Sequence, residues 1–379
     1  GSATPDIVSM YKARQGNYSL FTLRGRYNDM QLPKVEIVDM KRELRRGNGT
    51  DISEKLHEEL EDNISRGEQS ILFINRRGAN KLISCGECGH TYKCPRCSVS
   101  LTYHSANRRL MCHYCGYSQW LDDSCPECGG ELKYVGAGTQ MIETELKELF
   151  PDTEVIRLDT DTVTAAGSHE ALFERFRNEK IPIMVGTQMV TKGLNFENVT
   201  LVGVISADQS LYAGSFRAGE RTFSLLTQVV GRSGRGSKPG RAIIQTFTPE
   251  NETILQASRQ DYEDFYESEI QLRRLQNTPP FSEMLTVTAS GLNEAHVFQA
   301  CRYVRDRLDN IIGRDGSAVV LGPAPLAVVK VNNRYRYRVI IYGKKLSGLR
   351  GIVSGLVIEC CTDKRFSDVS VYADNDPAE

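Results

Sequence analysis

Eleven cysteines occur in this 379-residue chain, and eight of them lie between residues 85 and 128 as four C-x-x-C pairs. A C-x-x-C knuckle turns both sulfurs toward one ion, and two knuckles complete a tetrahedral site with Zn–S bonds of about 2.3 Å. Four thiolates leave no position open for water, so such sites are structural, and metal binding folds a segment too small for its own core. The sequence therefore predicts an insertion that binds two Zn²⁺ ions.

The order of the knuckles leaves two ways to pair them. We expect nested pairing, which keeps the ends of the insertion together, and sequential pairing is the alternative. Three histidines lie among the knuckles, but eight sulfurs already satisfy two ions, so His90, His104 and His113 are expected on the surface or in packing. Nested pairing assigns one ion to Cys85, Cys88, Cys125 and Cys128 and the other to Cys94, Cys97, Cys112 and Cys115.

The insertion also carries the chain's single tryptophan, Trp120, and several tyrosines. We interpret these rings as the small core of a zinc ribbon, and a platform that stacks nucleic-acid bases is the alternative. The tyrosines are Tyr92, Tyr103, Tyr114 and Tyr117.

Composition excludes some classes of protein. Hydrophobic residues make up 40% and charged residues 25%, which excludes global disorder. The chain shows no apolar run of about 18 residues and no signal peptide, so neither a membrane helix nor a disulfide framework is expected. The net charge of −1 argues against binding nucleic acid by bulk positive charge. Two local patches remain, since residues 71–120 carry seven Lys/Arg against one acid, and residues 327–350 carry seven against none.

Short apolar runs alternate with amphipathic segments on both sides of the insertion. Strands that alternate with helices predict a parallel sheet covered on both faces, so the cysteines interrupt an α/β domain. Strands are expected at 34–40, 70–75, 154–158, 182–186, 200–206 and 241–247, and helices at 52–65, 139–150, 168–178 and 217–230.

The pattern changes after residue 249. Residues 249–274 predict one long amphipathic helix with a solvated acidic face, and Pro279 and Pro280 mark a break after it. Beyond the break, the order strand, helix, strand, strand, helix, strand predicts a ferredoxin-like α+β domain. Its elements are expected at 284–290, 293–312, 318–321, 335–342, 347–361 and 368–373.

Residues 228–236 (QVVGRSGRG) end a helix and enter a glycine-rich turn. Arg232 and Arg235 are flanked by glycines and can approach a phosphate, where the planar guanidinium stabilises charge on a transferring phosphoryl group. An ordinary surface turn is the alternative.

Residues 185–193 (VGTQMVTKG) follow a strand at the edge where α/β sheets bind ligands. The chain contains no G-x-x-x-x-G-K-[ST] sequence, so a complete nucleotide hydrolase would need further parts.

Taken together, these residues resemble the C-terminal half of the PriA family of bacterial primosomal replication-restart helicases, in superfamily 2. The resemblance covers nearly the whole chain and rests on four C-x-x-C pairs between ILFINRRG and GTQM. By this resemblance, residues 1–5 (GSATP) are motif III at the end of a first RecA-like lobe, unless Gly1 and Ser2 are an expression scar. Residues 71–78, 186–193 and 228–235 are motifs IV, V and VI, and Asp208 and residues 216–221 (FRAGER) also match.

Three positions depart from the family's usual residues. Leu194 replaces a His after motif V, Ser215 replaces an Asp before Phe216, and Ser233 replaces an Ala in motif VI. No arginine is lost, but the change at Leu194 weakens any transfer of DNA contacts to that position.

The resemblance implies a RecA-like second helicase lobe with an inserted double zinc ribbon, followed by a ferredoxin-like C-terminal domain. Its function would be that of an ATP-dependent 3′–5′ DNA helicase that recognises and remodels stalled forks and initiates primosome assembly. Implied partners are forked and single-stranded DNA, single-strand DNA-binding protein, primosome proteins and the replicative helicase loader. It implies a monomer in the bacterial cytoplasm, at forks. The expected segments are 1–34 (end of lobe 1 and linker), 35–84 and 132–249 (lobe 2), 85–131 (insertion), 250–280 (connecting helix) and 281–379 (C-terminal domain).

The resemblance also implies roles for particular residues. ATP and Mg²⁺ would lie between this lobe and a first lobe outside the chain, so the chain alone is expected to be inactive. Arg232 and Arg235 would stabilise the transferring phosphate, Gln228 would orient a phosphate or the attacking water, and Gly231 and Gly193 would line the nucleotide. Candidate DNA contacts are Thr187, Gln188, Lys192, Arg334 and Arg336, with Lys93, Arg96, Arg108 and Arg109 of the insertion.

Two other functions stay open at this point. A non-catalytic zinc-ribbon module that binds nucleic acid or protein would share the cysteines but would not need Arg232 and Arg235. A different superfamily-2 repair helicase is the third interpretation, which the zinc block disfavours.

Overall fold

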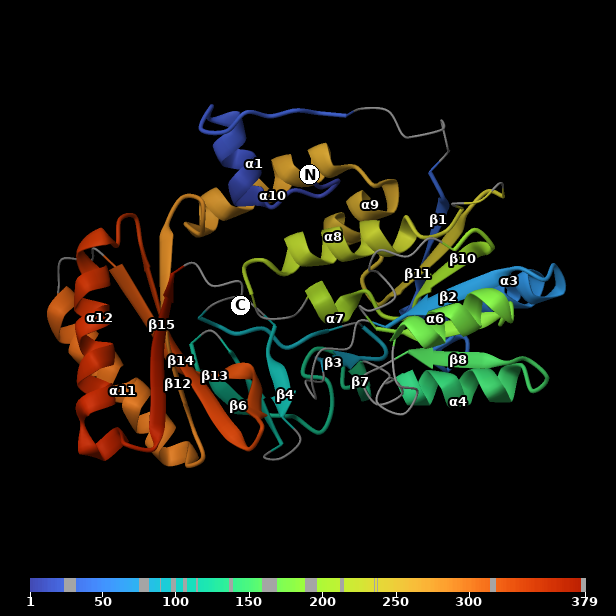
Figure 1. Cartoon of the computed structure of the whole chain (residues 1–379). Coiled ribbons are helices and arrows are strands. Elements are labelled where there is room, and N and C mark those ends of the chain that lie inside the picture. The colour runs from blue at the N-terminus through green and yellow to red at the C-terminus, as the bar shows by residue number, and fades with distance from the viewer. Residues whose placement is uncertain are drawn as a thin grey trace.

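The computed structural model describes residues 1–23, 32–74, 82–88, 90–96, 100–104, 108–113, 115–135, 139–158, 169–187, 196–211, 215–234, 236, 238–313 and 318–375. A parallel α/β domain lies at one end and an antiparallel α+β domain at the other, with the small strands of the insertion between them (Figure 1). Within these ranges, the longest apolar helices are still too short or too polar to cross a membrane.

Six parallel strands form the sheet of the first domain, in the order β1, β11, β10, β2, β9, β8. The strands β2, β9 and β10 are buried along their whole length. Helices cover both faces of the sheet, which explains why these strands are continuous apolar runs. The predicted parallel sheet is confirmed. Its strands are β1 (Lys34–Asp39), β2 (Gln69–Phe73), β8 (Val155–Leu158), β9 (Ile183–Gly186), β10 (Val199–Val204) and β11 (Arg241–Thr246).

A separate hydrophobic core lies on each face of this sheet. Alternate side chains of β2 and the next residue point to opposite cores, with Ile71 and Phe73 in one and Leu72 and Ile74 in the other. The first core is covered by α1 (Ile7–Arg14), α6 (His169–Asn178), α8 (Ala218–Val230), α9 (Glu252–Arg259) and α10 (Tyr262–Gln276). The second is covered by α2 (Met40–Arg45), α3 (Glu54–Ser65) and α4 (Thr139–Leu149), and the short α7 (Asp208–Leu211) precedes α8.

The single helix predicted over residues 249–274 is wrong. The chain forms α9 and α10 instead, because Gln260 takes a left-handed conformation with φ 54° and ends α9. Asp261 then caps α10 by accepting a hydrogen bond from the backbone N–H of Asp264. The acids of α10 do not all face solvent either, since Glu269 is only 6% exposed.

The insertion leaves the parallel domain through an antiparallel neck of β3 (Leu82–Cys85) and β7 (Leu132–Val135). Beyond the neck, β4 (Thr102–His104), β5 (Arg109–Met111) and β6 (Ser118–Trp120) form a small antiparallel sheet. Tyr92 and Tyr103 lie in its buried core, as predicted, and Tyr114 lies outside the described residues. The interpretation of Trp120 as a core residue is wrong, because Trp120 is 64% exposed.

The C-terminal domain has an antiparallel sheet in the order β13, β14, β12, β15, which is the ferredoxin-like order that the sequence predicts. The helices pack on one face, against core residues such as Val287 and Val339. The elements are β12 (Glu283–Gly291), α11 (Glu294–Ile312), β13 (Ala318–Val331), β14 (Arg334–Gly343), α12 (Ser347–Thr362), the 3₁₀ helix Lys364–Phe366 and β15 (Val369–Asn375).

The parts of the chain meet around Arg273 of α10. Its guanidinium donates to Glu269 Oε1 at 2.8 Å, to Glu220 Oε2 at 2.6 Å and to Pro279 O at 3.3 Å. The same group lies 5.2 Å from the ring centroid of Phe216, which packs against the core of the insertion. One buried cation therefore joins α8, α10, the entry to the C-terminal domain and the insertion.

A second junction connects the insertion directly to the C-terminal domain. His113 is 3% exposed, and its Nδ1 donates to Pro325 O at 2.8 Å. At Gly116 a Cβ atom would lie 2.6 Å from Pro323 O, so this close approach requires glycine. His113 thus packs between domains, in keeping with the packing role expected for it.

Candidate functional site

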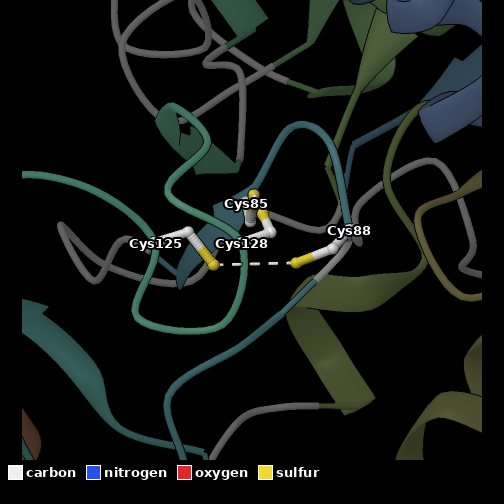
Figure 2. Close-up of side chains that lie close together, drawn as sticks. All are labelled: Cys85, Cys88, Cys125 and Cys128. Atoms are coloured by element: carbon white, nitrogen blue, oxygen red, sulfur yellow. Dashed lines mark hydrogen bonds between the residues drawn. The ribbon is translucent and has the colours of Figure 1, made fainter.

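The first group of cysteines closes the neck of the insertion (Figure 2). The Sγ atoms of Cys85 and Cys128 lie 3.5 Å apart, those of Cys88 and Cys125 lie 3.6 Å apart, and all four sulfurs fall within 4.8 Å of one another. A tetrahedral ion with bonds of about 2.3 Å needs sulfurs roughly 3.8 Å apart, whereas a disulfide needs about 2.0 Å. This sulfur set fits a tetrahedral metal site and is too open for disulfides.

The local backbone favours the thiolate of Cys85. Burial raises the pKa of this thiol, but hydrogen bonds from the backbone N–H groups of Cys88 and Glu87, together with those from the thiols of Cys128 and Cys88, lower the pKa to about 7. The knuckle itself supplies the backbone donors, because its turn directs them at the first sulfur. Since the thiolate is the form that binds zinc, the turn prepares the site for a metal.

The second group of cysteines lies inside the ribbon. Cys94, Cys112 and Cys115 have their sulfurs within 4.8 Å of one another, with 3.6 Å between Cys94 and Cys115. Cys94 and Cys112 are buried in the aromatic core of the insertion. Cys97, the fourth expected ligand, lies outside the described residues. These two groups are the ones that nested pairing assigns.

Gln228, Gly231 and Arg232 lie together at the carboxyl-terminal end of α8. The backbone N–H of Gly231 donates to Thr227 O, and that of Arg232 donates to Val229 O, which tightens the last turn. The loop then presses against the start of β10, where Gly234 N donates to Val199 O at 3.1 Å. Gly234 has φ +69°, and a Cβ there would lie 2.4 Å from Gly240 N, so the loop requires glycine. Arg235 and Gly193 lie outside the described residues.

A path of hydrogen bonds connects this helix end to the first residues of the chain. Gln228 is exposed, and its Nε2 donates to Ser224 Oγ at 2.9 Å. Ser224 Oγ lies 2.9 Å from Thr4 Oγ1. Thr4 belongs to the segment that resembles motif III, so Ser224 joins the segments that resemble motifs III and VI. Sequence reasoning missed Ser224, since a serine on a helix carries no signal of a partner 220 residues away.

Thr187 lies at the opposite edge of the sheet from this loop. It follows Gly186, the last residue of β9, whereas the loop contacts Val199, the first residue of β10. Because the strands are parallel, these positions are on the carboxyl and amino edges respectively. The structure therefore does not bring Thr187 together with Arg232. Gln188 and Lys192 lie outside the described residues.

Asp208 is buried near the carboxyl edge of the sheet, where its side chain joins two segments. Its carboxylate accepts hydrogen bonds from Thr246 Oγ1, Thr248 Oγ1 and Phe247 N at 2.8–3.0 Å. Burial raises the pKa of this carboxyl, while the hydrogen bonds act against that rise. These hydrogen bonds join the start of α7 to the end of β11, which explains the position of an acid at this point of the sequence.

Arg334, Arg336 and Arg338 alternate along β14, so their side chains project from one face, and each contacts another part of the chain. Arg334 Nη2 donates to Ser290 O at 2.8 Å, and Arg336 Nη2 donates to Val328 O at 2.9 Å. Arg338 Nη2 lies 3.4 Å from His113 O in the insertion. Arg334 and Arg336 are half-buried, so each combines a structural hydrogen bond with partly accessible charge.

Comparison with known proteins gives three family matches. Residues 94–119 match the PriA DNA helicase Cys-rich region, residues 132–237 match the helicase conserved C-terminal domain, and residues 274–378 match the primosomal protein N C-terminal domain. Among solved structures, yeast Dbp5 bound to RNA and ADP–BeF3 covers 72% of this chain and 54% of its own. Its TM-score is 0.34 and its identity 11%, too low to bear on function.

Curated relatives extend these matches over most of the chain. Replication restart protein PriA of Bacillus subtilis is 42% identical over 94% of this chain and 44% of the relative. The protein of that name from Synechocystis is 38% identical over 90% and 42%, and that from Rickettsia felis is 39% identical over 92% and 53%. The chain thus spans about half the length of the curated relatives it matches. In sequence and domain order it belongs with the C-terminal region of PriA replication restart proteins, with their Cys-rich zinc ribbon, helicase C-terminal domain and PriA C-terminal domain.

Proposed function

We propose that this chain is the C-terminal part of an ATP-dependent 3′–5′ DNA helicase that recognises and remodels stalled replication forks and initiates primosome assembly. The observation that carries the proposal is the end of α8. There Gln228, Gly231 and Arg232 lie at the start of a glycine-dependent loop, and Ser224 connects Gln228 to Thr4. Relatives 38–42% identical to this chain are named replication restart proteins, which supports this reading.

The end of α8 would form one wall of an ATP site. Arg232 and Arg235 would stabilise negative charge on the transferring phosphate, and Gln228 would orient a phosphate or the attacking water. Gly231 and Gly193 would allow close approach of the nucleotide. When bound, ATP supplies the phosphoryl group that is transferred to water. Neither a Walker lysine nor a Walker-type Mg²⁺ site occurs in this sequence, so a first lobe outside the chain would provide both.

The insertion, the C-terminal domain and the segment after β9 would hold DNA or partner proteins. Two Zn²⁺ ions on the cysteine groups would be structural, since each set of four thiolates fills the coordination shell. Thr187, Gln188 and Lys192, with Arg334 and Arg336, would contact the DNA backbone, which fixes position without reading sequence. Partners of the whole protein would be forked and single-stranded DNA, single-strand DNA-binding protein, primosome proteins and the helicase loader.

The test of the ATP wall uses the full-length protein. Arg235→Ala should abolish DNA-stimulated ATP hydrolysis and leave DNA affinity unchanged, because the arginine acts on the phosphate. Arg259→Ala is the matched control, since Arg259 is an exposed arginine paired with Asp264 on another helix. Equal losses of hydrolysis and DNA binding in Arg235→Ala would contradict the proposal, as would DNA-stimulated hydrolysis by this chain alone.

A further inference from the structure

The small sheet of the insertion has one face in a buried core, and on the other face the row that contains Trp120 is accessible although Thr102 is buried. Its register places Tyr103, Leu110 and Gln119 side by side, and Tyr103 and Leu110 belong to the buried core. Side chains alternate along each strand, so the neighbouring row projects from the other face. In that row Arg109 pairs with Trp120.

Trp120 is accessible on this other face although it is a large apolar ring. It is 64% exposed, and the guanidinium carbon of Arg109 lies 4.8 Å from the ring centroid. Arg109 Nη2 also lies 3.3 Å from Ser118 O, so a hydrogen bond holds the guanidinium beside the ring. The sheet thus presents an indole with a fixed cation next to it.

The charge around this ring favours a polyanion. Residues 93–121 contain four basic residues and no Asp or Glu, and Arg108 directly before Arg109 is exposed. Two acids follow Leu121: Asp122, which accepts a hydrogen bond from Tyr92 OH at 2.8 Å, and the exposed Asp123. Lys93 and Arg96 are exposed as well. The basic residues supply contacts to phosphate, and the indole supplies a flat apolar surface.

We propose that Trp120 and Arg109 form a stacking site for an unpaired base of single-stranded DNA. This inference rests on the proposed function and names one site within it. A base in a duplex has both faces covered by its neighbours, whereas an unpaired base exposes a face that can stack on an indole. Arg109 keeps the indole in place, and the surrounding cations hold the backbone. The site therefore prefers single strands to blunt duplex.

The single tryptophan makes the test direct, because indole emission from the zinc-loaded chain comes from Trp120 alone. Titration with an oligothymidylate strand should quench this emission with the same midpoint as fluorescence anisotropy of the labelled strand. An abasic strand of equal length and charge should bind more weakly and leave the emission unchanged. A blunt duplex should also leave it unchanged.

Affinity measurements on variants complete the test. Trp120→Ala should weaken single-strand binding about 5- to 150-fold, the loss expected for one stacked base at ~1.4 kcal/mol per factor of ten. Trp120→Phe should recover most of this loss. Tyr18→Ala, which removes an aromatic side chain of similar exposure after α1, should have no effect.

The outcomes separate this site from the proposed function. Strand binding with unchanged Trp120 emission, or equal affinity for the abasic strand, would overturn the stacking site and leave helicase function standing. A chain that binds no DNA at all would overturn the stacking site and also the proposed DNA contacts of this half. A Trp120→Ala variant with unchanged zinc content and unchanged affinity would likewise overturn it.

Discussion

Replacing Arg273 by Met tests whether the buried ion cluster stabilises the junction of the domains. The side chain of Arg273 is 1% exposed. It lies between the side chains of Glu269 and Glu220, which are 7% and 14% exposed. Methionine keeps much of the apolar stem but leaves two carboxylates without their cation. Removing one partner of a buried ion pair costs about 3–5 kcal/mol, whereas an exposed pair contributes about 0–1 kcal/mol. We therefore expect a loss of about 3–5 kcal/mol in the free energy of unfolding.

Urea unfolding of the zinc-loaded chain, followed by circular dichroism, measures this loss. The slope is ~1–3 kcal/mol/M for small proteins and rises with size, so at the upper value the midpoint should fall by roughly 1–2 M. The control Arg259→Met breaks an exposed pair with side chains 61% and 49% accessible, so its midpoint should barely move. Adding Glu269→Gln to Arg273→Met should restore part of the loss, because one stranded charge disappears. A shift no larger than that of Arg259→Met, or no restoration, would refute the reasoning.

The loss should also depend on pH in one direction. Burial raises the pKa of Glu269, and Arg273 acts against that rise. Without Arg273 the pKa of Glu269 rises further. At pH values just above the ordinary Glu pKa, Glu269 is then protonated in the folded variant and ionised in the unfolded chain. The variant then gains stability relative to the parent as pH falls into that window. A constant gap between variant and parent from pH 7 downward would contradict this account.

Three further predictions follow from single sites. Cys112→Ser should lower bound zinc from two ions to one by elemental analysis, and unchanged metal content would contradict the assigned ligands. Burial raises the pKa of Asp51 to about 6, and the nearby charge of Glu145 adds to the rise. Between about pH 4 and pH 6 the folded state therefore binds more protons than the unfolded state, so the folded state loses stability as pH rises through that window. Asp51→Asn should thus stabilise the chain by about 1–2 kcal/mol at pH 7 and not at pH 4, and equal gains at both would refute this. Gly234→Ala should destabilise the chain more than Gly16→Ala. Both glycines have positive φ, but only a Cβ at Gly234 would clash with backbone, 2.4 Å from Gly240 N. Equal losses in urea unfolding would argue against the packed loop.

Much of the fold could be predicted because local patterns encode it. Continuous apolar runs mark strands covered on both faces, and the four C-x-x-C pairs mark a metal-binding insertion whatever surrounds them. The ferredoxin-like order follows from the alternation of short elements after Pro280. The strand predicted at 318–321 is longer in the structure, since β13 runs to Val331 through a register shift after Leu321.

The remaining features depend on contacts that no local pattern carries. Gln260 breaks the predicted helix with neither Gly nor Pro to signal it, and the capping Asp261 decides where the next helix begins. Trp120 lies on a strand of three residues, so which face it occupies depends on the register with Arg109 and not on its own sequence. Ser224 and Arg273 join segments far apart in the chain. The residue boundaries of the expected segments and the roles of the site residues stay predictions.

The most direct test of the whole account is the affinity of this chain for a labelled fork and for a matched blunt duplex, measured by fluorescence anisotropy at two salt concentrations. We expect tighter binding of the fork, with an affinity that falls as salt rises, because local basic patches contact phosphates. Equal affinity for fork and duplex, or no binding to either at low salt, would contradict the claim that this half recognises forked DNA.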